Sequence, residues 1–198
     1  MMMLKRSFDL IVSLIALLLL SPIFILISLL VFFTSRGGIF YIQKRVGKNF
    51  REFGIIKFRT MKPHSDKKGL LTVGGRDPRV TVVGYYLRKY KIDELPQLIN
   101  VLIGDMSIVG PRPEVKKYVD FYTDEQKKVL AIRPGITDQA SIAFSNENEV
   151  LEKYTDAEKA YIEIVMPAKL KLNLEYIEKR SFAGDLKLMV QTVFKIAR

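Results

Sequence analysis

The feature that most constrains this chain is an uncharged apolar run over residues 10–33, LIVSLIALLLLSPIFILISLLVFF. As one helix rising about 1.5 Å per residue, it would reach roughly 36 Å, which is enough to cross a hydrocarbon core of about 30 Å. A cleaved signal peptide fits poorly, because the run is long and no small-residue cleavage site follows it. The run therefore predicts a membrane-associated helix rather than a buried core helix.

Two details favour a re-entrant helical hairpin over a single crossing, which stays as the alternative. Ser21-Pro22 stands at the centre of the run, where proline removes a backbone donor and bends a helix. We expect the Ser21 hydroxyl to satisfy a carbonyl that is freed near Pro22. Basic residues flank both ends of the run: Lys5 and Arg6 before it, and Arg36, Lys44 and Arg45 after it. Because basic segments stay in the cytoplasm, both ends are expected on that side.

Composition narrows the chemistry that the chain can perform. Its 198 residues carry 32 Lys+Arg against 21 Asp+Glu, a formal charge of +11 that implies an anionic partner. There is no cysteine, and His64 is the single histidine, so thiolate nucleophiles and multi-histidine metal sites are excluded. We expect a membrane helix over residues 1–36 and one further domain over residues 37–198.

The remaining patterns predict a mainly helical α+β domain with a short β element and amphipathic helices at the membrane interface. Strands are predicted over residues 39–46 and 53–58, and a loop over residues 63–79. Apolar residues at helical spacing predict a helix over residues 95–103, with a left-handed cap at Gly104.

Further patterns predict helix ends and the later helices. Asp93 is expected as the N-cap of the helix over residues 95–103, with Pro96 in its first turn. Thr123 and Gln126 form a capping-box pattern that opens a short helix. The chain is expected to be largely helical over residues 156–179 and 185–197, with an interruption at Pro167.

Asp93 and Glu94 are adjacent acids in a basic chain. Helix capping alone would explain Asp93. A carboxylate at a helix N-terminus is also stabilised as an anion, and the same place attracts phosphate, so a nucleophile and its substrate can share one pocket. The neighbouring acid could hold a divalent cation or tune the pKa of the first acid.

Several basic side chains have a constrained backbone. Arg112 stands between Pro111 and Pro113, which present its guanidinium from a stiff support that suits bidentate phosphate binding. Lys57 and Arg59 alternate along a predicted strand and so share one face. Arg133 lies in another constrained turn, Arg-Pro-Gly. Each could be a solvated surface residue, but together they indicate a phosphate-rich substrate at a membrane surface.

Four motifs occur in a fixed order: KFRTM (residues 57–61), DELPQL (93–98), GDMSIVGPRP (104–113) and RPGIT (133–137). With the Ser-Pro-centred apolar segment, they resemble the monotopic (small) phosphoglycosyl transferases, a group of bacterial sugar transferases. The resemblance covers residues 5–137 and supports the re-entrant helix independently.

The resemblance implies transfer of a sugar 1-phosphate from a UDP-sugar to polyprenyl phosphate, with release of UMP. It implies that Asp93 attacks the β-phosphorus to form a covalent phosphosugar intermediate, and that Glu94 completes the acidic pair and assists either with Mg²⁺ or with the lipid phosphate. Both acids are therefore candidate metal ligands. Arg112, Lys57, Arg88 and Arg133 would line the anionic pocket, with Pro111 supporting Arg112 and Arg59 beside Lys57.

The expected setting is the cytoplasmic face of the bacterial inner membrane, where the chain would initiate a capsule, lipopolysaccharide or exopolysaccharide glycan. The expected partners are the UDP-sugar, the polyprenyl phosphate and membrane lipid, without nucleic acid, and a homodimer is left open. After Thr137 the sequence departs from the family pattern with Asp138-Gln139-Ala140-Ser141, which leaves the sugar unspecified. The stretch NENE (146–149) is either part of the sugar or uridine pocket or a surface loop.

Two rival functions need neither turnover nor an acidic nucleophile. One is a membrane tether or nucleic-acid-binding protein, which would spread basic residues over one face with aromatic residues between them. The other is a catalytically silent membrane scaffold of a glycan pathway. Release of UMP from a UDP-sugar separates both from the enzyme.

Overall fold

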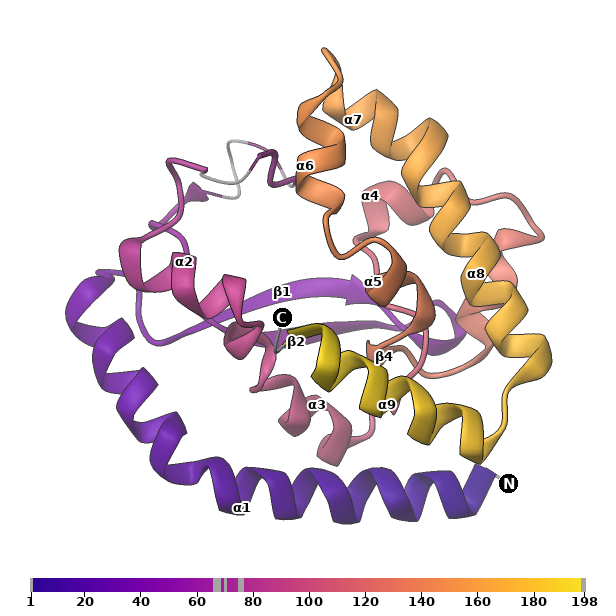
Figure 1. The fold of residues 1–198 in the computed structure, drawn as a ribbon, viewed down its shortest axis with the longest axis horizontal. Coiled ribbons are helices and arrows are strands. Elements are labelled where there is room, and N and C mark those ends of the chain that lie inside the picture. The colour runs from indigo at the N-terminus through magenta and orange to yellow at the C-terminus, as the bar shows by residue number, and fades with distance from the viewer. Residues whose placement is uncertain (1, 66–68, 70, 75–76, 197–198) are drawn as a thin grey trace.

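A computed structural model describes residues 2–65, 69, 71–74 and 77–196 of the chain. The loop predicted over residues 63–79 falls partly outside these residues. The described elements, drawn in Figure 1, are α1 (Met2–Thr34), β1 (Phe40–Val46), η1 (Lys48–Phe50), β2 (Glu52–Phe58), α2 (Val82–Lys89), η3 (Ile92–Glu94), α3 (Gln97–Ile103), β3 (Ser107–Val109), α4 (Lys116–Val119), η4 (Gln126–Ala131), β4 (Gly135–Thr137), α5 (Gln139–Ala143), α6 (Glu147–Glu152), α7 (Ala157–Ala160), η5 (Tyr161–Val165), α8 (Met166–Lys179) and α9 (Phe182–Ile196).

The apolar run lies within the long helix α1, which changes direction partway along its length (Figure 1). Pro22 lies inside this helix and cannot donate a backbone hydrogen bond to Leu18. The Ser21 hydroxyl donates to the Leu18 carbonyl instead, at 2.8 Å, as expected. Among the described helices, α1 is the one that is long and apolar enough to cross a membrane. The bend is therefore confirmed, while a re-entrant course in a membrane stays a prediction.

The two predicted strands form an antiparallel hairpin. β1 and β2 pair from Phe40 opposite Phe58 to Val46 opposite Glu52. The inward side chains of β2 include Ile55 and Phe58, which are almost fully buried. This hairpin gives the domain the short β element that the sequence predicted.

A second, smaller pair brings two sequence motifs together. β3, from the GDMSIVGPRP stretch, runs parallel to β4, from the RPGIT stretch. A Cβ on Gly135, the first residue of β4, would lie 2.1 Å from the backbone nitrogen of Gly110, which directly follows β3. No larger residue fits either side of this contact, so the two glycines allow the motifs to cross at close range. The GDMSIVGPRP stretch, with two glycines and two prolines, thus contains a short strand.

Several helix ends are as predicted. α3 ends at Gly104, whose φ of 99° is left-handed. The capping box is reciprocal: the Thr123 N–H donates to Gln126 Oε1 at 2.9 Å, and the Gln126 N–H donates to Thr123 Oγ1 at 3.3 Å. Near Pro167 the chain passes from a π-helical turn, η5, into α8 without leaving the helical path.

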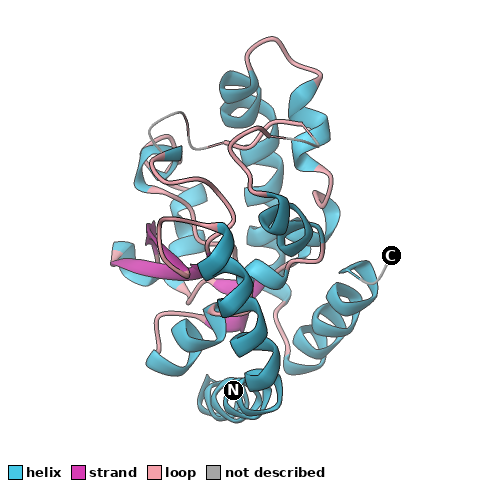
Figure 2. Ribbon diagram, turned by 90° about the vertical axis from the view of Figure 1, so that its left-hand side faces the viewer, coloured by secondary structure: helices cyan, strands magenta, loops and turns pink. Residues whose placement is uncertain are grey.

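Among the described residues, the hydrophobic core forms three clusters that meet at the β elements. One lies under α8 and α4, one lies between β2, α3 and β3, and one joins the second half of α1 to α2 through Ile27, Val31, Phe58 and Leu87. Figure 2 shows the short strands with helices around them and the first part of α1 nearly end-on below. The fold is a mainly helical α+β domain, as predicted. The acidic pair lies between α2 and α3, next to the end of β2.

Candidate active site

Asp93 and Glu94 lie in the 3-10 turn η3, between α2 and α3. Lys91, which precedes the turn, has a left-handed backbone with a φ of 56°. The N-cap of α3 is Pro96, so the prediction that Asp93 caps this helix is wrong. The tight turn begins before the helix and carries both acids into the interior, where Asp93 is 7% exposed and Glu94 is 9% exposed.

Glu94 is held by two cations. The guanidinium of Arg112 donates to both carboxylate oxygens, with Nη1 lying 3.1 Å from Oε2 and Nη2 bonded to Oε1. Lys57, on β2, donates to Oε1 at 2.9 Å. Burial alone would raise the pKa of Glu94, but Arg112 and Lys57 outweigh it and hold that pKa well below its usual range. Glu94 is therefore an anion across the physiological pH range.

Asp93 is in the opposite situation. Burial, followed by the charge of neighbouring Glu94, raises the pKa of Asp93, while Lys57, Arg88 and Lys91 partly offset this effect. Its Oδ1 atom is buried and has no hydrogen-bond partner among the described residues. An acid without a partner in a cationic environment is available to react with, or bind, something that approaches it.

The basic residues near the pair come from three different segments. Lys57 lies near the end of β2, Arg88 in the last turn of α2, and Arg112 in the loop after β3. The Nη2 of Arg88 donates to Thr72 Oγ1 at 2.8 Å. With Lys91, four cations act on two carboxylates, so the site keeps a positive excess that suits a phosphate-bearing ligand. Lys91 was not predicted as a site residue, because only the turn that follows it brings its charge close to the two carboxylates.

Arg112 is held at its backbone as well as at its side chain. The Arg112 N–H donates to Asp138 Oδ2 at 2.6 Å. Asp138 is 1% exposed and is also the N-cap of α5, where its other oxygen accepts from the Ser141 N–H. The stretch 138–141 that departs from the family pattern thus positions Arg112 through Asp138. This contact was not predicted from the sequence, because it depends on the parallel pairing of β3 with β4.

Two predicted site residues lie elsewhere. Arg59 donates to the Phe40 carbonyl at 3.0 Å, and its guanidinium lies 6.0 Å from the Tyr41 ring centroid, near the start of β1. Arg133 donates through Nε to the Gly104 carbonyl at 2.9 Å, at the end of α3 opposite to the acidic pair. Lys57 and Arg59 share a strand face in the sequence pattern, and Arg133 lies in the Arg-Pro-Gly turn. Neither feature determines the direction in which the arginine side chain extends.

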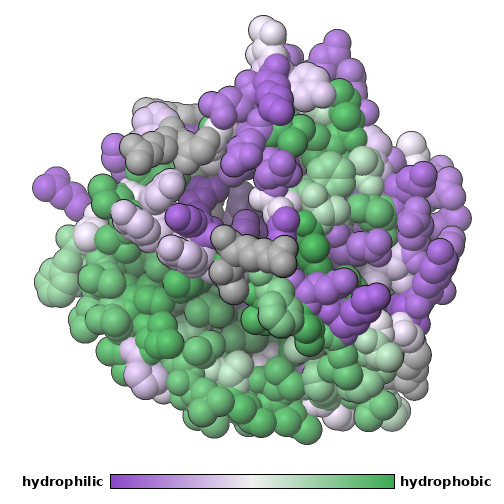
Figure 3. Space-filling view, viewed as in Figure 1, coloured by the Kyte–Doolittle hydropathy of each residue, from purple (hydrophilic) through white to green (hydrophobic). Residues whose placement is uncertain are grey.

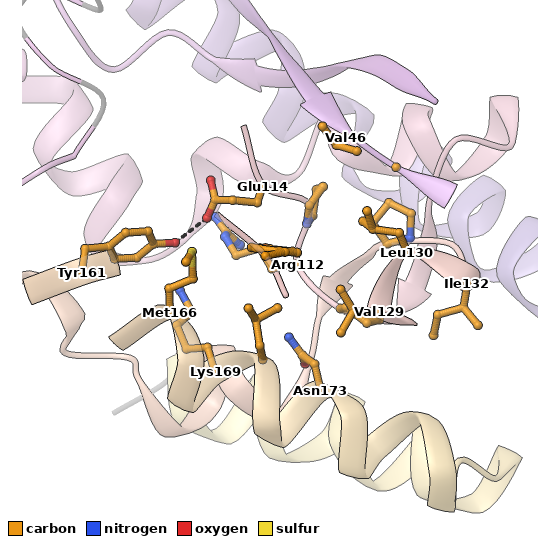
Figure 4. Close-up of a pocket in the computed structure, with 16 residues that line it drawn as sticks. Val46, Arg112, Glu114, Val129, Leu130, Ile132, Tyr161, Met166, Lys169 and Asn173 are labelled. Atoms are coloured by element: carbon orange, nitrogen blue, oxygen red, sulfur yellow. Dashed lines mark hydrogen bonds between the residues drawn. The ribbon is translucent and has the colours of Figure 1, made fainter. Parts of the chain in front are cut away.

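A small cavity lies beside Arg112, which is one of the residues that line it (Figure 4). Its volume of about 30 Å³ has room for one or two water molecules but not for a nucleotide. In its wall Tyr161 donates to Glu114, and Arg45 Nη1 donates to Glu114 Oε1 at 2.9 Å. The residues around this cavity support Arg112, and the cavity is too small to be the substrate pocket.

The stretch NENE does not line this cavity, but Glu147 forms an ion pair with Lys169, which does. Glu147, in α6, accepts from Lys169 Nζ at 2.5 Å, and its charge contributes to raising the pKa of Arg112 after the larger effect of Glu94. Glu147 is half-buried, whereas Asn148 and Glu149 are exposed. The stretch is thus a short helix in which one acid faces the interior.

Neither acid belongs to a three-ligand metal cluster within the described part of the chain. Mg²⁺ is usually held by one or two carboxylates together with waters and substrate phosphate oxygens. The unpartnered Oδ1 of Asp93 fits such an arrangement. Glu94 is less available, since Arg112 and Lys57 already occupy its oxygens.

Comparison with known proteins gives a consistent result. The model of the family described as "Bacterial sugar transferase" matches residues 1–198. "Exopolysaccharide production protein ExoY" of Sinorhizobium fredii is 34% identical over 204 residues, which cover 96% of this chain and 83% of that protein. "UDP-glucose:undecaprenyl-phosphate glucose-1-phosphate transferase" of Escherichia coli is 37% identical over 197 residues, covering 98% of this chain and 40% of that protein. "UDP-N-acetylgalactosamine-undecaprenyl-phosphate N-acetylgalactosaminephosphotransferase" of Aeromonas hydrophila is 42% identical over 193 residues, covering 96% and 42%.

Proposed function

Because the chain belongs to the bacterial sugar transferase family, we propose that it transfers a sugar 1-phosphate from a UDP-sugar to undecaprenyl phosphate through a covalent intermediate on Asp93. The names of the Escherichia coli and Aeromonas hydrophila relatives contain undecaprenyl phosphate together with UDP-glucose or UDP-N-acetylgalactosamine. The sugar of this chain is left open. The chain is a transferase, and the substrates and the intermediate are the proposal.

The contrast within the acidic pair is the observation that carries the proposal. Glu94 is bound on both oxygens by cations, whereas Asp93 has an unpartnered buried oxygen in the same cationic site. A carboxylate nucleophile must be free to form a bond to phosphorus, and Asp93 meets this requirement. Covalent catalysis then divides one difficult displacement into two easier steps.

In the first step, an Asp93 carboxylate oxygen attacks the sugar-bearing β-phosphorus of the UDP-sugar. The bond from this phosphorus to the bridging oxygen breaks, and UMP leaves with the electron pair. Arg112, Lys57 and Arg88 surround the place where charge develops and stabilise it. Asp93 must be ionised to react, and the positive charge of Arg88 and Lys91 favours that form.

In the second step, an oxygen of undecaprenyl phosphate attacks the same phosphorus, and the Asp93 carboxylate leaves. The product is an undecaprenyl diphosphate sugar, and the enzyme returns to its starting form. Asp93 Oδ1 would ligate Mg²⁺ together with substrate phosphate oxygens. When bound, Mg²⁺ offsets the repulsion between a carboxylate and a diphosphate.

Glu94 acts in this scheme as a positioning residue. Its low pKa makes it a poor proton acceptor, so a role as general base is disfavoured. By binding Arg112 and Lys57 it fixes the two cations on either side of the reacting phosphate. Asp138 fixes the Arg112 backbone by accepting a hydrogen bond from its N–H.

The surface of α1 supports a place at a membrane. Its exposed apolar side chains make the hydrophobic area along the lower left of Figure 3, while hydrophilic side chains gather at the top and right. We propose that α1 lies re-entrant in the cytoplasmic membrane and holds the acidic pair at the level of the lipid phosphates. The site then meets a water-soluble sugar nucleotide from one side and a lipid acceptor from the other.

The test is to incubate the full chain with Mg²⁺ and a panel of UDP-sugars without acceptor, and to record its intact mass. We expect one donor to add the mass of a sugar phosphate and to release UMP. Asp93→Asn should abolish the adduct and lower turnover by at least about a thousandfold. Asp124→Asn, which changes a 98% exposed carboxylate, is the matched control and should keep full activity.

Two outcomes would contradict the proposal. An active Asp93→Asn chain would place the nucleophile elsewhere. Absence of UMP release with every donor, even after undecaprenyl phosphate is added, would favour the catalytically silent scaffold. Thermal unfolding of each variant shows whether a loss of activity comes from a loss of folding.

A further inference from the structure

A second pocket lies at the N-terminal end of α1, at the end of α3 opposite to the acidic pair. The first turns of α1, the segment 131–133 and the junction between α8 and α9 enclose it, with a cavity volume of about 130 Å³. Ligand pockets for nucleotide-sized molecules usually exceed about 300 Å³. The cavity is thus suited to a single small group rather than to a sugar nucleotide.

The lining of this pocket is strongly basic. Its basic side chains among the described residues are Lys5, Arg6, Lys48, Arg133 and Arg180. Its carboxylates are Asp9 and Asp185. Five cations against two anions leave an excess of three positive charges around one small cavity, which predicts an anionic ligand.

Both carboxylates are already engaged. Asp9 accepts from the Ser107 hydroxyl at 2.7 Å and from the Ile108 N–H at 3.3 Å, so neutral donors bind it. Asp185 forms an ion pair with Lys5 and accepts from the Tyr176 hydroxyl at 2.6 Å. Neither carboxylate is hydrogen-bonded to an arginine of the pocket.

Two of the arginines are fixed side by side. Arg6 Nη1 donates to the Val101 carbonyl at 2.7 Å, and Arg133 Nε donates to the Gly104 carbonyl at 2.9 Å. Both guanidinium groups therefore converge on the C-terminal end of α3. Like charges that the fold holds this close repel each other, and an anion between them would relieve the repulsion.

The other two cations are available to a ligand. Lys48 and Arg180 are exposed, and the side chain of neither forms a hydrogen bond or an ion pair within the described part of the chain. Lys48 lies in η1 and Arg180 follows the end of α8, so two different elements bring them to the lining of the cavity. A bound anion could thus be met by two fixed guanidinium groups and two adjustable side chains.

The pocket lies where lipid head groups are expected. Lys5, Arg6 and Asp9 immediately precede the apolar run, and Leu4 and Leu186 nearby are exposed apolar side chains. Basic pockets at the ends of membrane helices bind lipid phosphates. We propose that this pocket is a second phosphate-binding site, suited to the head group of an anionic membrane lipid and, by the same chemistry, to free phosphate. The site is independent of the proposed transfer reaction.

The experiment compares two double variants of the full chain in a nonionic detergent. Lys48→Gln with Arg180→Gln removes the two unbonded cations of the pocket. Lys153→Gln with Lys171→Gln removes the same charge from exposed positions outside it. Thermal unfolding is followed while dihexanoyl phosphatidylglycerol, dihexanoyl phosphatidylcholine or inorganic phosphate is added.

We expect phosphatidylglycerol to raise the melting temperature of the native chain and of the control variant. The pocket variant should need at least about tenfold more ligand for the same shift, about 1.4 kcal/mol of binding, because it has lost two cations that would bind the phosphate. Phosphatidylcholine, whose head group is neutral overall, should act more weakly. Any shift that both variants retain reports phosphate bound at the acidic pair.

The ligands separate the two sources of phosphate. A shift with phosphatidylglycerol alone identifies a lipid head group, and an equal shift with inorganic phosphate identifies a general phosphate site; both support the pocket. Equal responses of the pocket and control variants, or no shift of the native chain with either ligand, would overturn it. Neither result depends on whether UMP is released.

Discussion

At the scale of single residues, Asp93 and Glu94 show how one turn can give adjacent acids different chemical properties. Both are buried to the same degree, so burial cannot distinguish them. The difference comes from the partners: Arg112 and Lys57 bind the Glu94 carboxylate directly, whereas cations act on Asp93 without an ion pair that the structure records. A short turn therefore produces one permanent anion and one acid whose ionisation is easily changed.

The ion pairs of Glu94 predict a pH-dependent loss of stability. Glu94→Gln leaves Arg112 and Lys57 without their carboxylate, and removing one partner of a buried pair costs about 3–5 kcal/mol. The folded-state pKa of Glu94 lies below its unfolded value, so its contribution is present above the unfolded pKa and is lost as the pH falls through the folded pKa. Urea unfolding at pH 7 should show the full loss.

The same measurement at acidic pH provides the check on the cause. The difference between Glu94→Gln and the native chain should shrink once the pH falls well below the ordinary glutamate value of about 4.3. Glu178→Gln, an exposed change near the end of α8, is the control and should cost less than about 0.5 kcal/mol. A difference that stays constant with pH would mean that packing, not charge, is lost.

At the scale of elements, local sequence patterns correctly predicted features that depend on interactions between residues close together in the sequence. The two strands, the Gly104 cap and the Thr123–Gln126 capping box all depend on neighbours within a few residues, and the structure confirms them. The N-cap role of Asp93 was wrong because Pro96 can also begin a helix, so the sequence pattern did not specify the first residue of α3.

Contacts between distant elements were beyond the reach of these patterns. The hydrogen bond from the Arg112 N–H to Asp138 joins the loop after β3 to the start of α5. Arg133 was expected at the acidic pair, but a parallel strand pairing directs it to the other end of α3. A long flexible side chain can reach in several directions, and only the tertiary fold selects one of them. The motifs were thus sufficient to locate the site, but not to assign every residue to it.

The position of α2 predicts a large effect of one methyl group. A Cβ on Gly84 would lie 2.1 Å from the carbonyl oxygen of Thr60, which is backbone and cannot rotate away. Gly84→Ala should therefore push α2 from the end of β2, cost about 1–3 kcal/mol or more, and displace Arg88 from Asp93. We expect a lower melting temperature and a lower turnover together.

Gly184→Ala is the matched control, because Gly184 is also helical. Its new Cβ would meet the Ser181 hydroxyl, the end of a side chain, at 3.1 Å. Alanine stabilises a helix over glycine by about 1 kcal/mol, so this variant should be neutral or more stable. Equal losses from both substitutions would contradict the close contact at Gly84.

At the scale of the whole molecule, α1 is both a membrane element and part of the core. Most of its apolar side chains are exposed, yet Ile27 and Val31 are buried against Phe58 and Leu87. The bend at Pro22 allows the second part of the helix to reach this cluster. The length of the apolar run was enough to predict a membrane helix, but its packing on β2 and α2 required the fold.

The bend predicts the topology of the chain. If both ends of α1 face the cytoplasm, single cysteines placed at residues 2 and 40 should react with an impermeant reagent from the same side. The natural sequence has no cysteine, so each label is unambiguous. Pro22→Ala should restore a backbone donor, favour a straight helix and move one label to the opposite side.

Phe24→Ala is a control that weakens packing beside the bend without replacing the proline. It should lower stability but leave both labels on the same side. Opposite-side labelling of the chain with Pro22 intact would refute the re-entrant course and establish a single crossing.

The ion pair between Lys5 and Asp185 joins residues that are 180 positions apart in the chain. A ribosome adds about 5–20 residues per second, so Lys5 waits roughly 10–35 seconds for its partner to be made. During synthesis, α1 is therefore made before the ion pair that joins its first turns to α9 can form. The basic pocket can therefore form only after α9 has been made and has folded against the first turns of α1.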